Sequence, residues 1–187
     1  MPDDPEVLIV SATASEARYV PADARLLICG IGKATAAMTL TRELASGPPV
    51  SRVVNIGTAG ALHGHHAGLY LPSAVLEHDI SSAALTAMGY PLVDRWELPG
   101  GDATVLASGD TFVADEAHRD RLAQTADLVD MEGAAIARVC AEFGVALRLA
   151  KVVSDYADDG AMDWPAAVDA AARTLGDWLT ATGLGAR

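Results

Sequence analysis

The sequence has few basic residues and few cysteines, and both shortages exclude classes of function. Lysine and arginine total 13 against 25 acidic residues, which gives a formal net charge of −12, and the basic residues form no cluster. Such a chain repels a phosphate backbone, so we expect no nucleic-acid partner. The two cysteines, Cys29 and Cys140, lie in apolar segments, which favours buried thiols in a reducing compartment over a disulfide or a metal pair.

Long apolar runs are also missing. No run is long enough to span a bilayer, and residues 1–6 are acidic and lack the pattern of a signal peptide. We therefore expect a cytoplasmic protein with no membrane partner. The chain has no evident repeat, low-complexity segment or interdomain linker, and 187 residues with 51% hydrophobic content suit one core. The prediction is a single domain over residues 1–187.

What the sequence does have is an alternation of short, β-branched apolar runs with alanine-rich amphipathic stretches. This alternation is typical of an α/β protein whose largely parallel sheet is covered by helices. The predicted strands span residues 7–12, 25–31, 52–58, 73–80, 104–107 and 147–154. The predicted helices span residues 33–45, 115–125, 132–143 and 164–180, and the predicted loops span residues 61–68 and 90–101.

Polar residues follow most of the predicted strands. In an open α/β sheet, ligands bind beyond the carboxyl ends of the strands, so these residues are the first candidates for a site. The polar segments span residues 11–16, 30–33, 57–60, 108–112, 130–133 and 154–159. We expect these segments to meet at one edge of the sheet.

One glycine-containing run, residues 29–35, resembles a phosphate-binding motif only in part. Leu27 stands where a Walker A loop needs glycine, and Ala34 stands where it needs serine or threonine. Thr35 stands where a dinucleotide fingerprint has its third small residue. We therefore predict no cofactor. The glycines of this run, like those of segment 57–60, mark either simple turns or a close approach of a ligand to the backbone.

A histidine-rich loop contains His63, His65 and His66. Neutral imidazoles are common metal ligands, but no cysteine or carboxylate completes a set at a usual spacing. The acidic run 155–159 lacks the spacing of a calcium loop. We predict no metal site, and a solvated loop for the histidines.

Two carboxylates stand where a sheet-edge site places its chemistry. Asp155 ends an apolar strand, where a carboxyl group is expected to be partly desolvated and able to donate a proton near neutral pH. Glu132 opens a helix, and on its own it is equally well explained as a first-turn residue stabilised by the helix dipole. The residues alone leave both interpretations open.

Four motifs follow one another along the chain: Gly30-Ile31-Gly32-Lys33, Ser108-Gly109-Asp110-Thr111-Phe112, Met131-Glu132-Gly133-Ala134-Ala135-Ile136-Ala137 and Ser154-Asp155-Tyr156-Ala157-Asp158. In this order they resemble the nucleoside phosphorylase/nucleosidase superfamily, and most closely its 5'-methylthioadenosine/S-adenosylhomocysteine nucleosidases. Residues 78–79 and 86–90 resemble the family's loop that reaches a neighbouring subunit's site. The resemblance implies a homodimer and a three-layer α/β/α sandwich with a mixed, largely parallel sheet. The sheet's periphery would be abbreviated within residues 16–25 and 101–104.

The resemblance also implies roles for individual residues. Asp155, oriented by Ser154, would protonate N7 of a purine, and Glu16 would activate the attacking water. Glu132 would hold the ribose hydroxyls, with Met131 packed on the sugar. The remaining substrate-binding residues would be Ile31 and Met88, then Thr58, Ala59 and Gly60 beside the sugar and water, and Phe112 and Val113 at the base.

These residues suit cleavage of an N-glycosidic bond, because protonating the base and placing carboxylates beside an oxocarbenium-like state both lower the barrier. Phosphorylases of the superfamily tend to carry arginine where this chain has Asn55, which favours water as nucleophile, although Arg18 offers an anion contact. The predicted function is hydrolysis of 5'-methylthioadenosine, S-adenosylhomocysteine or a related purine nucleoside. The alternatives are a purine nucleoside phosphorylase, a futalosine-type hydrolase and a non-catalytic nucleoside-binding module.

Overall fold

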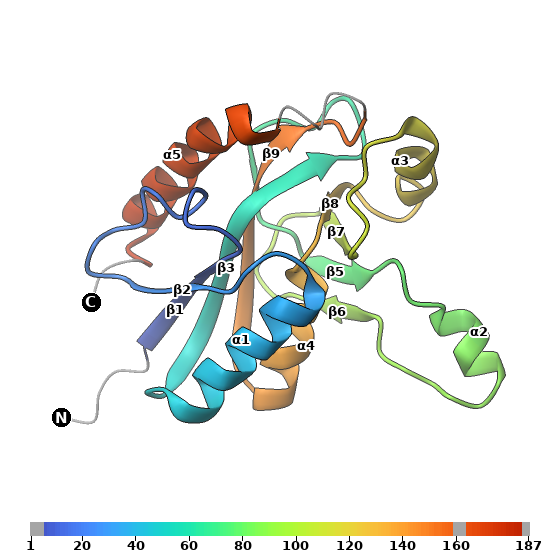
Figure 1. Cartoon of the computed structure of the whole chain (residues 1–187), viewed down its shortest axis with the longest axis horizontal. Coiled ribbons are helices and arrows are strands. Elements are labelled where there is room, and N and C mark those ends of the chain that lie inside the picture. The colour runs from blue at the N-terminus through green and yellow to red at the C-terminus, as the bar shows by residue number, and fades with distance from the viewer. Residues whose placement is uncertain (1–5, 159–163, 185–187) are drawn as a thin grey trace.

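The computed structural model describes residues 6–158 and 164–184. Its strands are β1 (Glu6–Ser11), β2 (Arg25–Ile28), β3 (Val50–Ala61), β4 (Leu69–Tyr70), β5 (Ala74–Glu77), β6 (Arg95–Glu97), β7 (Val105–Ser108), β8 (Leu128–Asp130) and β9 (Ala146–Asp155). Its helices are α1 (Lys33–Ser46), α2 (Ser82–Ala87), α3 (Glu116–Leu122), α4 (Gly133–Phe143) and α5 (Trp164–Thr182). Figure 1 shows a central sheet with helices on both faces.

The strands form one mixed sheet in which most neighbours are parallel. Its order is β2-β1-β3-β8-β7-β5-β6, while β9 pairs with β3 and with the short β4. The antiparallel pairs are β3 with β8, β4 with β9, and β5 with β6. The predicted α/β fold with a mixed, largely parallel sheet is confirmed.

Alternate side chains of the central strands fix the two helix layers. Leu8 and Val10 of β1 pack in one core with α1 and α4, while Ile9 packs in a second core with α5. Both faces of this strand are therefore buried, as its unbroken apolar sequence predicts. Cys29 and Cys140 are both free thiols buried in the first core, as predicted.

Several predicted boundaries and elements are wrong, for two physical reasons. Strand β3 was predicted to end at residue 58 but continues to Ala61. Of the two interpretations of segment 57–60, the simple turn is therefore wrong, because pairing with β9 and β8 keeps these small residues extended. The predicted loop 90–101 contains β6. Strands β4 and β8 and helix α2 were not predicted, because elements of two to six residues are too short to show a periodicity.

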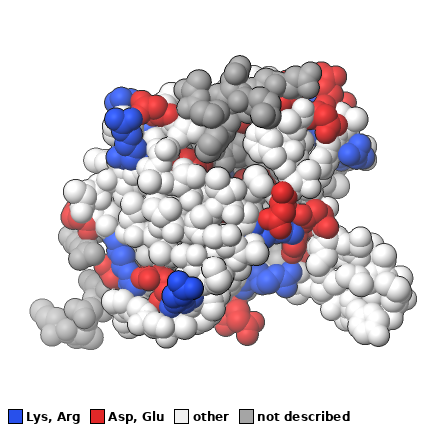
Figure 2. All heavy atoms as spheres, viewed as in Figure 1, with Lys and Arg blue, Asp and Glu red and all other residues white. Residues whose placement is uncertain are grey.

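An arm, residues 80–93, extends from the body of the protein and carries α2 (Figure 1). No residue of α2 is buried, and Met88, Tyr90 and Val93 are 64%, 70% and 58% exposed. The arm contains no charged residue, and in Figure 2 its surface is white throughout. Such an uncharged, exposed extension is typical of a contact surface. Among the helices of the described residues, none has the length and apolar character needed to cross a membrane.

Candidate active site

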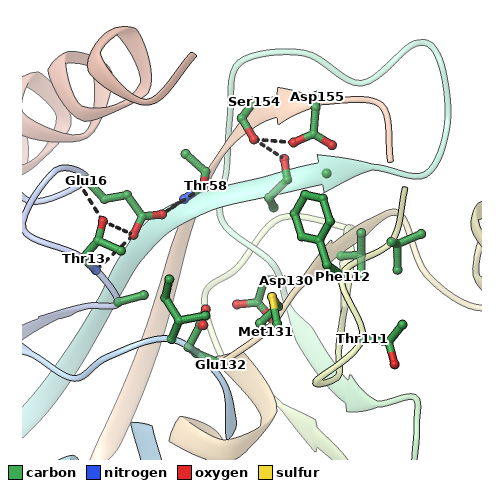
Figure 3. A pocket seen from close by; sticks show the side chains of 16 residues that line it. Thr13, Glu16, Thr58, Thr111, Phe112, Asp130, Met131, Glu132, Ser154 and Asp155 are labelled. Carbon is green, nitrogen blue, oxygen red and sulfur yellow. Dashed lines mark hydrogen bonds between the residues drawn. The ribbon is translucent and has the colours of Figure 1, made fainter. Parts of the chain in front are cut away.

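A cavity of about 310 Å³ opens at the carboxyl edge of the sheet (Figure 3). It is bounded by the ends of β3 and β9 and by the segments that follow β1, β2, β7 and β8. Its lining residues are Ala12, Thr13, Glu16, Ile31, Thr58, Ala59, Gly60, Thr111, Phe112, Val113, Val129, Asp130, Met131, Glu132, Ser154 and Asp155. Each of the polar segments predicted to meet at one edge contributes to it, although Asp159 lies outside the described residues.

Every site residue predicted from the sequence lines this cavity except Met88. Met88 caps the C-terminus of α2 in the arm and lies outside the cavity. Because the resemblance assigns this residue to a neighbouring subunit's site, a position away from its own cavity is compatible with that prediction. The cavity brings the other residues together, and their individual roles stay predictions.

Glu16 is only 4% exposed, and four protein donors hold its carboxylate. Its Oε1 accepts hydrogen bonds from the N–H and the hydroxyl of Thr58, both at 2.8 Å. Its Oε2 accepts the N–H of Thr13 at 3.2 Å and the Thr13 hydroxyl at 3.0 Å. The Thr13 hydroxyl also accepts the N–H of Glu16 at 3.2 Å, so the two residues form a capping box. The T-x-x-E spacing could have identified Thr13 from the sequence.

Glu132 is the N-cap of α4 and is buried beside the first turn of α1. Its Oε1 accepts the N–H of Gly32 at 2.9 Å, and Gly32 has a φ of +88°, a conformation that favours glycine. Burial, and next the negative charge of Asp130, raise the pKa of Glu132 to about 7, although Lys151 opposes this shift. The Glu132 carboxyl group therefore exchanges its proton near neutral pH.

Two donors orient the carboxyl group of Asp155. Ser154 Oγ donates to Oδ2 at 2.7 Å, and the N–H of Ala157 donates to Oδ1 at 2.9 Å. Ala157 is fully buried with a φ of +50°, a left-handed conformation that a non-glycine residue keeps only when its surroundings impose it. The turn after β9 therefore fixes Asp155, which Figure 3 shows on the opposite side of the cavity from Glu132.

A buried ion pair beside these acids was missed by the sequence reasoning. Lys151 Nζ lies 2.8 Å from Asp130 Oδ2, and each side chain is 2% exposed. Burial favours the neutral lysine, but the charges of Asp130 and Glu132 outweigh it and raise the pKa of Lys151. A Cβ on Gly57 would lie 3.1 Å from Glu16 Oε1 and 3.4 Å from Lys151 Nζ, so both groups converge on this glycine. A single lysine inside the apolar run of β9 was the available signal.

The lining of the cavity is acidic. It includes the carboxyl groups of Glu16, Asp130, Glu132 and Asp155, and none of its described lining residues is a lysine, an arginine or a histidine. Arg18, suggested from the sequence as an anion contact, is not among the lining residues, and its Nη1 lies 3.0 Å from Asp169 Oδ1 with the side chain 66% exposed. Such a cavity favours a neutral or cationic ligand over a phosphate.

The histidine-rich loop forms a cluster of rings away from this cavity. The ring centroids of His65 and His66 are 4.2 Å apart, and Nε2 of His63 and of His66 each lie 3.9 Å from Asp127 Oδ1. Within residues 6–158 and 164–184, no group of three or more histidine, cysteine or acidic side chains has the geometry to hold a metal ion.

The chain is similar to known proteins over most of its length. The Phosphorylase superfamily matches residues 102–181. The 5'-methylthioadenosine/S-adenosylhomocysteine nucleosidase of Haemophilus influenzae (strain 86-028NP) is 31% identical over 191 residues, covering 84% of this chain and 79% of that protein. The nucleosidase of the same name from Geobacillus thermodenitrificans is 32% identical over 187 residues, covering 85% and 78%. Because 191 aligned positions exceed the length of this chain, the first alignment contains gaps where this chain is shorter.

Solved structures agree on the fold. A Helicobacter pylori nucleosidase mutant with 5'-methylthioadenosine in its active site aligns with a TM-score of 0.83 at 23% identity, covering 95% of this chain and 97% of that one. A futalosine hydrolase of Helicobacter pylori strain 26695 aligns with a TM-score of 0.82 at 23% identity, covering 94% and 96%. The chain therefore belongs to the nucleoside phosphorylase/nucleosidase superfamily, in which it is similar to the 5'-methylthioadenosine/S-adenosylhomocysteine nucleosidases.

Proposed function

We propose that this protein hydrolyses the N-glycosidic bond of a purine nucleoside and releases the free base and the ribose moiety. The observation that carries the proposal is the meeting of Glu16, Glu132 and Asp155, from three separate strand ends, around one cavity of about 310 Å³. Cleavage of this bond develops positive charge on the sugar and negative charge on the base. Carboxylates beside the sugar and an acid at the base stabilise both charges.

Asp155 is proposed as the acid that protonates N7 of the base. Ser154 and the N–H of Ala157 hold its carboxyl group at the edge of the cavity, so the proton donor meets the base in one orientation. Phe112 lies at the same cavity and is 46% exposed, so its ring is available to stack on the base. Proton transfer from a group placed in this way contributes roughly 10² to 10⁴ to the rate.

Glu16 is proposed to activate the attacking water. A carboxylate can accept about four hydrogen bonds. In Glu16 these are taken by the N–H and the hydroxyl of Thr13 and by the N–H and the hydroxyl of Thr58. A water that donates to Glu16 must therefore displace one of the two rotatable hydroxyls, since the backbone donors are fixed. Glu132, with a pKa of about 7, is proposed to bind the ribose hydroxyls as acceptor or donor.

Water is the nucleophile that the lining supports. Phosphate would need a cation, and the described lining contains four acids and no basic side chain. Asn55, which stands where superfamily phosphorylases tend to carry arginine, is buried and donates its Nδ2 hydrogen to the carbonyl of Val10 at 3.1 Å. The same acidic lining disfavours nucleotides as substrates. From the names of the relatives, we propose 5'-methylthioadenosine, S-adenosylhomocysteine or a related nucleoside such as futalosine.

The proposed assembly is a homodimer in the cytoplasm. The arm is exposed, apolar and free of charge, and a second copy of the chain is the partner that the resemblance implies for it. In that arrangement Met88 of each arm would complete the other subunit's cavity. Light scattering should give twice the mass of one chain, and Met88→Asp should lower the mass and the affinity for substrate together.

A nucleoside panel tests the proposed reaction. The protein is incubated in phosphate-free buffer with 5'-methylthioadenosine, S-adenosylhomocysteine, futalosine, adenosine and inosine, and free base and free sugar are quantified. We expect base release from at least one nucleoside without phosphate and loss of release in Asp155→Asn. Turnover that depends on phosphate and yields ribose 1-phosphate would establish a phosphorylase instead. Saturable binding without any turnover would identify a nucleoside-binding module.

A further inference from the structure

Three loops at the carboxyl edge of the sheet are joined to one another just outside the active-site cavity. Lys33 begins α1 after β2, Asp79 follows β5 and Asp110 follows β7. We call these three residues the triad. None of them is among the described residues that line the cavity, but Ile31 and residues 111–113, which stand next to Lys33 and Asp110 in the chain, do line it. The triad therefore lies directly behind the cavity wall.

Hydrogen bonds close the triad into a ring. Asp110 Oδ1 accepts the backbone N–H of Lys33 at 2.8 Å. Asp79 Oδ2 accepts the backbone N–H of Asp110, also at 2.8 Å, and Asp79 Oδ1 accepts a hydrogen bond from Lys33 Nζ. Each residue contacts both of the others, so none of the three loops can move away without breaking a bond of the triad.

The charges of Lys33 and Asp79 are partly shielded from water. The side chain of Lys33 is 17% exposed, and its Nζ also lies 2.7 Å from Glu77 Oε1. Burial favours the neutral lysine, but the hydrogen bonds to Asp79 and Glu77 outweigh it and raise the pKa of Lys33. Burial favours the neutral form of Asp79 too, but Lys33 and the N–H of Asp110 outweigh it and lower the pKa of Asp79. Both groups are therefore charged at neutral pH, where hydrogen bonds between them are strong.

The triad also fixes the root of the arm. Asp79 directly precedes the arm, residues 80–93, and in Figure 2 basic and acidic side chains gather where the arm meets the body. Arg138 of α4 donates hydrogen bonds to Glu77 Oε2 at 3.1 Å and to the carbonyl of Val93 at 2.8 Å. Both ends of the arm are therefore tied to the body, one to α1 and α4 and the other to α4.

One bond of the triad lies next to the contact that holds Glu132. The N–H of Gly32, the residue before Lys33, donates to Glu132 Oε1 at 2.9 Å. A Cβ on Gly32 would lie 3.1 Å from Asp110 Oδ1, so the Asp110 carboxylate packs directly against this glycine. Asp110 therefore supports the backbone turn that directs the N–H of Gly32 at Glu132.

We propose that Lys33, Asp79 and Asp110 are positioning residues of the active site, which hold the Gly32 N–H against Glu132 and the wall at Phe112 in place together with the root of the arm. The inference rests on the proposed function, because it concerns how that cavity binds a nucleoside. Groups that touch a substrate work best when surrounding hydrogen bonds lock their positions, and a displacement on the order of 1 Å costs about 100-fold in rate. The triad acts through Glu132 and Phe112, since it does not line the cavity itself.

A titration of Glu132 in the nucleoside-free protein tests the first part of the proposal. The δ-carbon signal of ¹³C-labelled Glu132, identified by its absence in Glu132→Gln, should titrate with a midpoint of about 7 in wild type. Burial raises the pKa of Glu132 and the N–H of Gly32 opposes this, so Asp110→Ala should raise the midpoint by about 0.5 in pH as that bond weakens. The other titratable groups near Glu132 are the same in both proteins, and they are Asp130, Lys151, Glu16 and Cys29.

Kinetics with 5'-methylthioadenosine test the second part. Asp110→Ala should raise KM about tenfold, because the wall at Phe112 loses its support and binding energy is lost. Asp110→Asn keeps an oxygen that can accept the N–H of Lys33, so it should restore both KM and the Glu132 midpoint to near wild type. Asp79→Ala removes the acceptor of the Asp110 N–H and should change both measurements in the same direction as Asp110→Ala.

Asp102→Ala is the matched control. Asp102 also joins two segments, by accepting the N–H of Leu71 at 2.7 Å and the N–H of Thr104 at 2.8 Å. It precedes β7, however, and so lies at the amino end of the strand whose carboxyl end leads to Asp110. Asp102→Ala should leave KM and the Glu132 midpoint unchanged, while ¹⁵N spectra verify that each variant is folded.

Several results would overturn the proposal. A wild-type midpoint in Asp110→Ala, or an equal shift in Asp102→Ala, would show that the triad does not act specifically on Glu132. An Asp110→Asn variant as impaired as Asp110→Ala would show that the bond to the Lys33 N–H is not the support. If wild type neither binds nor cleaves the nucleoside, the proposed function fails, whereas the titration, which uses no nucleoside, still decides whether the triad positions Glu132.

Discussion

The carboxylate of Glu16 accepts both the N–H and the hydroxyl of Thr58, each at 2.8 Å. The residue that we propose as the activator of water is therefore fixed by a strand that lies 42 residues further along the chain. The backbone donor cannot turn away, but the hydroxyl can rotate towards the cavity. The N–H of Thr58 therefore positions the carboxylate of Glu16, while the Thr58 hydroxyl can be exchanged for the attacking water.

We predict that Thr58→Val lowers kcat about 10- to 100-fold with little change in KM, because it removes the hydroxyl that, once turned from Glu16 towards the cavity, can hydrogen-bond to the water that takes its place. Thr58→Ser keeps the hydroxyl and should restore most of the rate. Thr111→Val is the matched control, since Thr111 lines the same cavity. Steady-state kinetics with the best substrate of the panel check this prediction. If Thr58→Ser is as slow as Thr58→Val, packing of the threonine methyl group matters and the hydroxyl does not.

The raised pKa of Glu132 makes stability depend on pH. Because the pKa of about 7 lies above the ordinary value of 4.5, the folded state binds this proton more tightly than the unfolded chain does. Glu132 contributes fully to the free energy of unfolding below pH 4.5, and this contribution is lost as the pH rises through 7. We therefore expect wild type to lose up to about 3 kcal/mol relative to Glu132→Gln between about pH 5 and about pH 8.

Urea unfolding of both proteins at a series of pH values measures this difference. Titratable groups that wild type and variant share contribute equally to the pH dependence of both free energies of unfolding, so their contributions cancel in the difference. Glu97→Gln is the control, because Glu97 is 71% exposed and is not expected to change the pH dependence. A difference between wild type and Glu132→Gln that is constant over this range would contradict the assignment.

The strands and helices that could be predicted are those whose apolar pattern runs along the whole element. Strand β1 has a continuous apolar sequence, and helix α4 has a run of small and apolar residues; both were located within one or two residues. Glu132 and Asp155 were identified as candidates because each stands directly at such a boundary. A boundary is a local property, so the sequence alone is sufficient to indicate it.

The unpredicted parts depend on contacts between distant segments. Nothing near Gly60 in the sequence shows that β3 continues past it, because the strand is extended by pairing with Asp155 and Val129. Lys151 and Asp130 are likewise separated by a helix, and their partnership exists only once β8 and β9 are in place. Such pairs need the tertiary structure before they can be recognised.

The ion pair between Lys151 and Asp130 yields a stability prediction. Removing the lysine leaves a carboxylate in a site that is 2% exposed, so Lys151→Met should cost about 3–5 kcal/mol. The double variant Lys151→Met/Asp130→Asn removes the stranded charge and should recover a large part of this loss. Chemical denaturation of the single and double variants measures the coupling. A double variant whose loss equals the sum of the single losses would show that the two groups do not interact.

Gly60 tests whether the position of Asp155 limits the reaction. A Cβ at residue 60 would lie 3.0 Å from Asp155 Oδ1 and 3.2 Å from the Cβ of Ala157, so Gly60→Ala must displace the carboxyl group or the turn that holds it. A displacement on the order of 1 Å at a reacting group costs about 100-fold in rate. Gly64→Ala is the control, because a Cβ at Gly64 meets nothing within 4 Å.

The expected result for Gly60→Ala is a large fall in kcat with a folded protein, which circular dichroism and the thermal midpoint verify. The pH dependence of kcat separates a moved acid from a merely narrowed cavity, because narrowing raises KM and leaves the ionisation limbs unchanged. Wild-type kcat in Gly60→Ala would mean that Asp155 tolerates displacement. It would then be unsuited to the role of a positioned acid, and the assignment of the proton donor would have to move to another group of the cavity.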